Sequence, residues 1–258
     1  MYCFIDYRCS DEEINNIVNQ GLTPIIVPKT NKVYDAINGH VDIQMNIISQ
    51  NTVIIHKSID KSFCNALDNC NIKYIFSNDE LKYSYPNDII LNGIVLDNYF
   101  IHNLKYTDKN LLDNMKDKKL INVKQGYSKC SVLVVGKKAI ITSDKGISNA
   151  LKEENFDILL VPPGDIILPS MNYGFIGGTG GLINDNTMAF FGDLKNYAYG
   201  QEVYDFLYKY DVKPIYLSKG KLIDRGSIYV VWYKIPHRYK YSILISSKLL
   251  LVYYNSIW

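Results

Sequence analysis

One pattern of short elements recurs along this chain at a nearly constant spacing, and it constrains the fold more than any other feature. Each unit has a first strand, a second strand, a helix that begins at an acidic or polar residue, and a third, apolar strand. The second strands begin about 40 to 50 residues apart, near residues 53, 99, 139 and 188. Because a repeat of this size cannot bury its apolar face alone, we expect the units to pack against one another.

The apolar pattern and the helix start signals assign the elements of four complete units. Second strands are expected at Thr52–Ser58, Tyr99–Tyr106, Lys138–Asp144 and Thr187–Asp193. Helices are expected at Asp60–Cys70, Asp108–Asp117, Asp144–Asn155 and Gly200–Tyr210. Third strands are expected at Ile72–Ser77, Leu120–Lys124, Asp157–Pro162 and Lys213–Ser218. First strands open at polar or glycine-rich stretches that begin at Gly39, Tyr85, Gln125, Gly174 and Leu222.

The fifth unit lacks a helix of its own, and the N-terminus offers the missing pieces in order. They are strand Tyr2–Tyr7, helix Asp11–Gln20 and strand Thr23–Pro28. A ring that joins its first segment to its last unit has no free sheet edge. We therefore predict a single α/β domain, a five-bladed pseudo-symmetric α/β propeller of ββαβ repeats. The blades are expected at residues 39–83, 84–124, 125–172, 173–221 and 222–240, the last of them closed by residues 1–30.

Composition excludes several classes of protein. Hydrophobic residues make up 47% of the chain and charged residues 21%, which is typical of a folded globular protein. The 28 Lys and Arg nearly balance the 26 Asp and Glu, and the arginines are Arg8, Arg225 and Arg238. Since bidentate phosphate recognition uses arginine, we expect no nucleic-acid partner.

The cysteines and the chain ends indicate a cytoplasmic protein. The five cysteines have neither disulfide-framework nor paired zinc-site spacing, so we expect no metal site; they are Cys3, Cys9, Cys64, Cys70 and Cys130. The N-terminal sequence has no basic region followed by an apolar stretch, so no signal peptide is expected. Tyr241–Trp258 is apolar but short and contains Lys248, so we interpret it as strands or an added tail and expect no membrane contact.

Polar residues gather at the openings of the first strands. If the first strands point toward the axis of a ring, their openings crowd a central pocket. The polar residues at these openings are His40, Asp42, Asn87, Asp88, Asn92, Gln125, Tyr127, Lys129, Asp224 and Arg225. Their recurrence at equivalent repeat positions is the strongest functional signal in the sequence.

Four short strings carry a resemblance to a known superfamily. They are HNLKYTD (His102–Asp108), QGYSKCS (Gln125–Ser131), ITSDKGI (Ile141–Ile147) and GFIGGTGG (Gly174–Gly181). They resemble a bacterial family of unknown function that has the guanidino-group-modifying enzyme fold, also called pentein. The superfamily includes arginine deiminases, dimethylarginine dimethylaminohydrolases, amidinotransferases and a non-catalytic ribosome anti-association factor. The resemblance runs from Tyr2 to about Gly226, and the segment after Ile228 departs from the family's usual ending.

The resemblance implies a reaction whose chemical groups this chain lacks at the matching positions. The superfamily's enzymes have a nucleophilic Cys at the opening of the fifth blade, a His at the third and a carboxylate in the second. The matching positions here are near Arg225 and Gly226, Gln125 and Asn92. An amide is no general base, and an arginine repels a guanidinium substrate. The resemblance thus supports the fold and argues against the superfamily's reaction.

Three residues are candidates for relocated catalysis. Cys130 follows Lys129, which favours a thiolate if both face one way, although strand neighbours face opposite sides and a buried structural cysteine is the alternative. His40 and Asp42 are two residues apart, so strand alternation places them on one face; the alternative is a strand-end pair bonded to the backbone.

Other conspicuous residues have structural explanations. The glycines of Gly177–Gly181 fit neither standard phosphate-binding motif, so we expect them to let the fourth blade approach the axis closely. His56 and His102 lie in apolar strands and are expected in the core. Asp144 and Asp193 follow second strands, as turn or helix N-cap residues do.

These observations predict a binding protein with a central channel and no cofactor. The expected ligand is a small polar molecule, amino-acid-like or guanidino, bound without the superfamily's Cys/His chemistry. The expected lining residues are His40, Asp42, Asn92, Gln125, Tyr127, Lys129, Asp224 and Arg225. Two alternatives stay open. One is a divergent amidine or amide hydrolase or transferase that uses Cys130, or His40 with Asp42, and the other is a non-catalytic interaction module.

Overall fold

The computed structural model of this protein describes residues 1–231. The predicted tail at 241–258 and residues 232–240, assigned to the last blade, lie outside the described residues. No helix within residues 1–231 has the length and apolar content that a bilayer crossing requires.

Five three-stranded sheets make up the β structure of the described chain. In chain order they are β3 (Met45–Ser49), β4 (Thr52–Ile55) and β5 (Lys73–Phe76); β6 (Ile94–Val95), β7 (Tyr99–His102) and β8 (Lys119–Asn122); β9 (Val132–Gly136), β10 (Ala139–Thr142) and β11 (Asp157–Leu160); β12 (Gly180–Asn184), β13 (Thr187–Phe190) and β14 (Lys213–Tyr216); and β15 (Tyr229–Val231), β1 (Tyr2–Asp6) and β2 (Thr23–Val27). In every sheet the first two strands are antiparallel and the last two are parallel.

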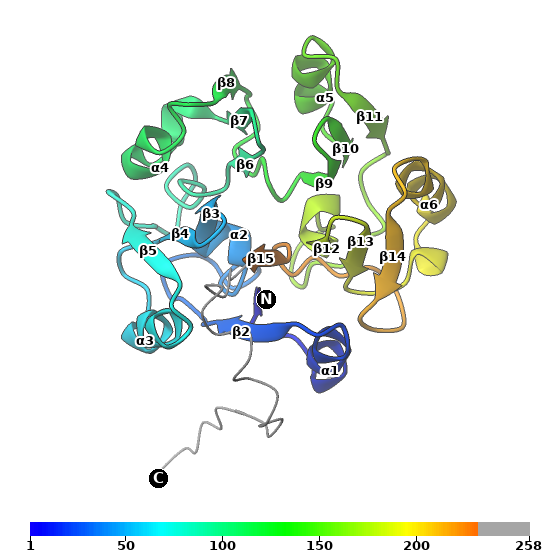
Figure 1. Ribbon diagram of the computed structural model, residues 1–258. Helices are drawn as coiled ribbons and strands as arrows, with labels where there is room; N and C mark the ends of the chain where they lie inside the picture. The colour runs from blue at the N-terminus through cyan, green and yellow to red at the C-terminus, as the bar shows by residue number, and fades with distance from the viewer. Residues whose placement is uncertain (232–258) are drawn as a thin grey trace, which may run out of the picture.

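A helix connects the two parallel strands of every sheet, because parallel neighbours need a crossover. These helices are α1 (Asp11–Asn19), α3 (Lys61–Asn69), α4 (Lys109–Asp113), α5 (Lys145–Lys152) and α6 (Gly200–Lys209). Shorter helical turns are α2 (Val41–Gln44), η1 (Leu104–Tyr106), η2 (Ile176–Thr179) and η3 (Leu194–Asn196). The crossover helices lie at the periphery of the molecule, and the first strands lie nearer its centre (Figure 1).

The predicted second strands, helices and third strands all begin at the predicted residue or one residue away. Three of the helices start where an aspartate side chain accepts a backbone N–H, at Asp60, Asp108 and Asp144. Helix α1 has a capping box between Ser10 and Glu13. The first strands start later than predicted, because turns and short helices occupy the polar openings.

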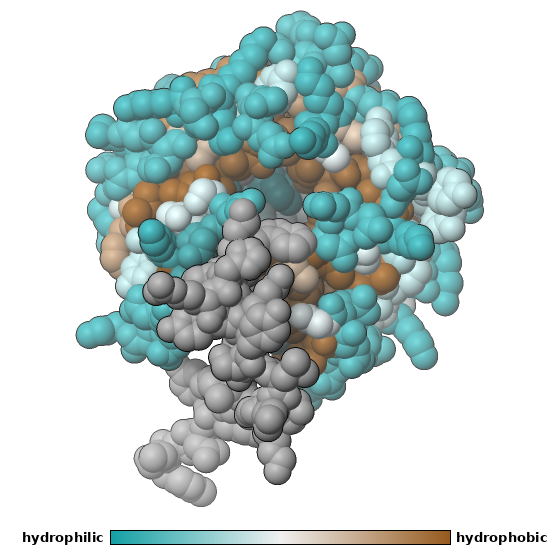
Figure 2. Space-filling model, in the orientation of Figure 1, coloured by the Kyte–Doolittle hydropathy of each residue, from teal (hydrophilic) through white to brown (hydrophobic). Residues whose placement is uncertain are grey.

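The second strand is the middle strand of each sheet and is buried on both faces. In β10, Ile141 packs toward the fourth sheet while its neighbour Ile140 packs toward the second. This explains why the second strands are continuous apolar runs instead of alternating ones. On the face shown in Figure 2, hydrophilic residues cover most of the outer margin and hydrophobic residues appear further in.

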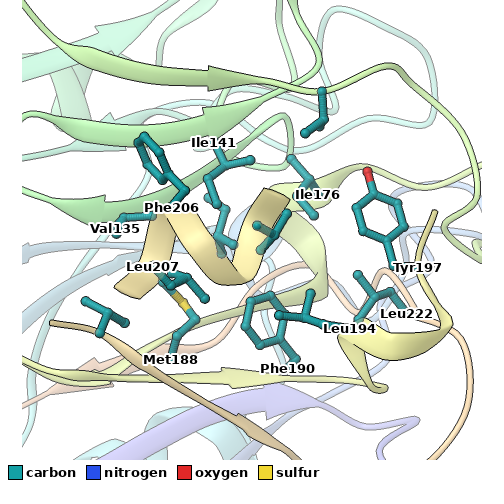
Figure 3. Close-up of a cluster of buried hydrophobic side chains, with 14 of the residues drawn as sticks. Val135, Ile141, Ile176, Met188, Phe190, Leu194, Tyr197, Phe206, Leu207 and Leu222 are labelled. Carbon is teal, nitrogen blue, oxygen red and sulfur yellow. The ribbon is translucent and has the colours of Figure 1, made fainter. Parts of the chain in front are cut away.

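Neighbouring sheets share hydrophobic clusters. One cluster joins Val135 of the third sheet to Phe190 of the fourth, with Leu207 of α6 beside them (Figure 3). Another joins Phe4 of the fifth sheet to Val53 of the first. Three further clusters join the first sheet to the second, the second to the third and the fourth to the fifth. Five such seams bury the apolar faces that single units leave exposed.

Two buried histidines confirm the core positions predicted for them. His102 Nδ1 lies 2.7 Å from Thr107 Oγ1, and Nε2 donates to the Gly126 carbonyl at 3.0 Å. His56 Nε2 lies 3.3 Å from Gln44 Oε1. Burial lowers the pKa of each ring to about 4.

We expect the His102→Gln variant to lose less stability in acid than the parent protein. The unfolded ring takes up a proton near pH 6.5, whereas the folded ring resists protonation down to about 4, so stability falls as pH drops through this window. The parent should lose about 2 kcal/mol through His102 between pH 7.5 and pH 5, and the variant should be spared that loss. Urea unfolding at the two pH values measures the difference.

The matched control is Thr107→Val. It removes the hydrogen bond between Thr107 Oγ1 and His102 Nδ1 but leaves the titratable His102 ring in place. Relative to the parent, this variant should lose the same amount of unfolding free energy at pH 7.5 and at pH 5. An unchanged pH dependence in His102→Gln would mean that the folded protein accepts the proton as readily as the unfolded chain.

Candidate functional site

The openings of the first strands meet, but they do so as turns and short helices. His40 precedes α2, whose residues include Asp42, so the expectation that both alternate along a strand is wrong. The backbone turns here because Asp42 N donates to the Gly226 carbonyl and Gln44 N donates to the His40 carbonyl, at 3.1 and 3.3 Å. A single helical turn thus aims these side chains inward.

Asp42 is fully buried and lies at the centre of a polar network. Cys130 Sγ donates to Asp42 Oδ1 at 3.1 Å, and Ser227 Oγ lies 2.6 Å from Asp42 Oδ2. Lys129 Nζ donates to Ser227 Oγ at 2.8 Å. The network therefore unites the openings of the first, third and fifth units.

Lys129 and Cys130 do not face opposite sides, because they lie in a turn before β9 and not in a strand. Both side chains reach the Asp42 network. Burial, reinforced by the Asp42 carboxylate, raises the pKa of the Cys130 thiol well above its usual value. Burial lowers the pKa of Lys129, while Asp42 opposes that change. Cys130 is thus a protonated donor here, not the thiolate that an adjacent lysine would favour.

His40 and Asp224 form a second buried pair. His40 Nε2 lies 3.8 Å from Asp224 Oδ1, which is too far for a hydrogen bond. Asp224 is held by the backbone N–H groups of Phe175 and Gly226, at 2.8 and 3.0 Å. Burial raises the pKa of the Asp224 carboxyl group, and His40 opposes that rise.

A cavity of about 260 Å³ lies against this pair. Its lining includes the buried side chains of His40, Cys130 and Asp224. Four aromatic rings also line it: those of Tyr127 and Phe175 are 6.3 Å apart, those of Tyr173 and Phe175 are 6.4 Å apart, and the fourth is that of Tyr34. The lining residues are Tyr34, Ile37, His40, Tyr127, Cys130, Leu168, Met171, Asn172, Tyr173, Phe175 and Asp224.

A buried carboxyl group supports one wall of the cavity. Tyr127 Oη donates to Asp88 Oδ2 at 2.5 Å, and the hydroxyls of Tyr34 and Tyr127 lie 3.2 Å apart. Burial raises the pKa of Asp88, and the Tyr127 hydrogen bond opposes that rise. The hydroxyl chain fixes both tyrosine rings at the cavity.

Three of the eight predicted lining residues, His40, Tyr127 and Asp224, line this cavity. The other five do not: Asp42, Asn92 and Lys129 belong to the polar network behind it, and Gln125 and Arg225 have partners elsewhere. The Gln125 side chain donates to Asp144 and accepts from the Tyr127 N–H. Arg225 Nη2 lies 3.4 Å from Glu13 Oε2, on helix α1. Asn87 lines a different hollow of about 460 Å³, on the first and second units, with Lys57, Lys82 and Lys105 in its wall.

Asn92 lies within the network but both ends of its amide are occupied. Its Nδ2 donates to the Asp42 carbonyl at 2.8 Å and lies 3.2 Å from Cys130 Sγ. Its Oδ1 accepts from the N–H groups of Lys129 and Cys130, at 2.9 and 3.3 Å. Asn92 thus braces the first and third units against the second.

Sequence reasoning missed Ser227, Tyr34 and Phe175. Ser227 has a left-handed backbone with φ of 72°, which is strained for a residue other than glycine. In the sequence, the signal that could have indicated this residue is its place directly after Gly226, at the opening of the fifth unit. Tyr34 precedes the first unit's opening, and nothing in its sequence context indicates that it reaches a cavity.

The sequence matches one protein-family model. The model is described as "Family of unknown function (DUF6873)" and matches residues 4–229. A comparison with curated protein sequences finds no match.

Solved structures of amidinotransferases resemble this fold. SxtG, an amidinotransferase of the saxitoxin biosynthetic pathway from Microseira wollei, aligns with a TM-score of 0.51 and 8% identity over 87% of this chain and 89% of that chain. The inosamine-phosphate amidinotransferase StrB1 from Streptomyces griseus aligns with a TM-score of 0.52 and 8% identity, over 83% and 76%. At this identity the likeness shows the fold alone: this chain has the same mixed α/β architecture as these two amidinotransferases.

Proposed function

This chain belongs to the family of unknown function DUF6873, and we propose that it binds a small molecule with a cationic guanidino or amino group in the cavity beside His40 and Asp224. One observation carries the proposal: the Asp224 carboxylate lines the cavity while fully enclosed by protein. A buried carboxylate is costly to keep charged unless a cation pairs with it. An organic cation in the cavity would supply that partner.

The surrounding charge supports a cationic ligand. Asp42, Asp88 and Asp224 are all buried at or beside the cavity. Lys129 partly balances the negative charge of Asp42, to which it is linked through the Ser227 hydroxyl. Arg225, the second cation predicted at the cavity, is paired with Glu13 instead. The net charge of the groups around the cavity is therefore more negative than the sequence suggested.

The aromatic walls also suit a cation. Guanidinium groups stack on aromatic faces, and Tyr34, Tyr127, Tyr173 and Phe175 offer four rings around the cavity. A volume of about 260 Å³ lies just below the range of drug-sized pockets, so a compact ligand is expected.

We expect L-arginine to bind at least about tenfold more tightly than L-citrulline, its neutral counterpart of nearly equal shape. The Asp224→Asn variant should weaken arginine binding by about 30-fold or more, because a buried charge loses its partner. Isothermal titration calorimetry on the full chain measures both, with agmatine and methylguanidine to vary ligand length.

The control is Asp193→Asn, since Asp193 is also largely buried but caps η3 away from the cavity. It should bind arginine as the parent does. Equal binding of arginine and citrulline, or an unaffected Asp224→Asn variant, would contradict the cation proposal. Failure of all these compounds to bind would favour the interaction module.

A second candidate function is an amidine hydrolase or transferase with relocated groups. Cys130 Sγ, a ring nitrogen of His40 and a carboxylate oxygen of Asp42 lie within 4.8 Å of one another. The Cys130 sulfur would bond to the amidine carbon as its proton passes to His40, which would then protonate the departing amine. Ammonia release from guanidino compounds, abolished in Cys130→Ser, tests this candidate.

We also propose that the five sheets form a closed five-bladed propeller around the cavity. The pairing of Tyr2 with Val231 and the cluster between the fifth and first sheets support closure. A crystal structure in which β15 is separated from β1 would contradict it.

A further inference from the structure

The His40 ring is fully buried, and neither of its nitrogens has a hydrogen-bond partner within residues 1–231. A neutral imidazole has one donor and one acceptor, and each buried group left without a partner costs about 1–3 kcal/mol. By contrast, His102 finds partners for both nitrogens. The His40 ring is therefore placed for a partner that the polypeptide does not supply.

Two metal-binding side chains lie next to this ring. A ring nitrogen of His40, a carboxylate oxygen of Asp42 and Cys130 Sγ all lie within 4.8 Å of one another, and all three residues are buried. Tetrahedral ligands around zinc are roughly 3.3–3.8 Å apart, because the metal bonds are about 2.0–2.3 Å long. Shifts of about 1 Å would bring these atoms into coordination.

We propose that His40, Asp42 and Cys130 bind a divalent transition-metal ion, with zinc as the best chemical match. Imidazole, carboxylate and thiolate are all ligands that zinc accepts. The ion would replace the thiol proton of Cys130, which leaves to water, and the hydrogen bond from Cys130 to Asp42 becomes a shared metal contact. Three protein ligands leave a fourth position for water, a ligand or Asp224.

Neighbouring groups already orient two of the three ligands. Ser227 Oγ lies 2.6 Å from Asp42 Oδ2, which leaves Oδ1 toward Cys130. The Asn92 Nδ2 group lies 3.2 Å from Cys130 Sγ, where it can donate to a thiolate. Outer partners of this kind hold metal ligands in place in proteins that bind metals.

The sequence analysis singled out these three residues for catalysis but predicted no metal site, since no metal-binding motif spaces residues 40, 42 and 130. The fold brings the opening of the third unit against that of the first. The proposal goes beyond the binding of an organic cation, because it needs the Cys130 thiol and not the Asp224 carboxylate or the aromatic walls.

Cobalt(II) binding to the full chain, after treatment with a chelator, tests the site. We expect one cobalt per chain, a thiolate-to-cobalt charge-transfer band in the near ultraviolet, and loss of both signals when zinc is added. The Cys130→Ser variant should lose the charge-transfer band. The His40→Gln variant should bind zinc about 100-fold more weakly or worse, since loss of even an outer partner costs roughly 10- to 100-fold.

The control is Cys70→Ser, which changes a half-buried thiol outside the cluster and should keep the band. Absence of the band in the parent chain, or its persistence in Cys130→Ser, would overturn the proposal. Circular dichroism checks that both variants fold. If His40→Gln does not fold, the Cys130→Ser variant alone decides the test. Cobalt binding without arginine binding would reject only the organic cation, and the reverse result would reject only the metal.

Discussion

Replacing Gly177 with alanine should lower the free energy of unfolding by about 3 kcal/mol or more. The added Cβ would lie 2.4 Å from the carbonyl oxygens of Lys129 and Val132 and 2.6 Å from that of Cys130. All three are backbone atoms, so no side chain can rotate away to make room. The glycine therefore permits close contact between the third and fourth units.

Urea or thermal unfolding measures the effect, and a loss of 3 kcal/mol corresponds to a fall in Tm of roughly 6–12 °C for a chain of this size. Gly136→Ala is the matched control, because its Cβ would meet nothing closer than 3.7 Å. That control should be neutral or slightly stabilising. Equal stability of the two variants would mean that η2 does not pack tightly on the third unit.

The Asn92→Ala variant should lose about 3 kcal/mol of stability in the absence of any ligand. Truncation leaves the Asp42 carbonyl and the Cys130 N–H without the partners that Asn92 provides. Each buried backbone group left unsatisfied costs about 1–3 kcal/mol. Chemical denaturation of the purified variant measures the loss.

Asn114→Ala is the control, because Asn114 makes one exposed hydrogen bond within its own helix turn. It should change stability by less than about 0.5 kcal/mol. A loss below about 1 kcal/mol in Asn92→Ala would show that Asn92 does not brace the units. Its predicted role as a ligand contact would then be the remaining explanation.

The fold was predictable from the sequence because its signals are local. Asp60, Asp108 and Asp144 each mark a helix start, and each side chain caps the helix that follows. The middle strands of the sheets are apolar runs because both faces are buried. The missing helix of the fifth unit and the spare elements at the N-terminus pointed to a shared last sheet, which β1, β2 and β15 form.

The site was only partly predictable, because its geometry depends on contacts between distant segments. His40 and Asp42 were expected on a strand, but hydrogen bonds such as that from Asp42 N to Gly226 wind the chain into a helical turn. Gln125 and Arg225 are polar residues at strand openings, which is why they were predicted to line the cavity. In the folded chain, Gln125 is hydrogen-bonded to Asp144 and Arg225 is paired with Glu13, and the sequence does not show such partners.

The pairing of β1 with β15 determines the order in which this protein can complete folding during its synthesis. Four sheets draw their three strands from one continuous stretch, so each can assemble soon after it leaves the ribosome. In the fifth sheet Tyr2 pairs with Val231, and at 5–20 residues per second the partner strand emerges roughly 10–50 s after β1. During that interval one edge of β1 lacks its native partner and is open to pairing with other chains. The segment synthesised before the other four sheets is thus the last to reach its native pairing.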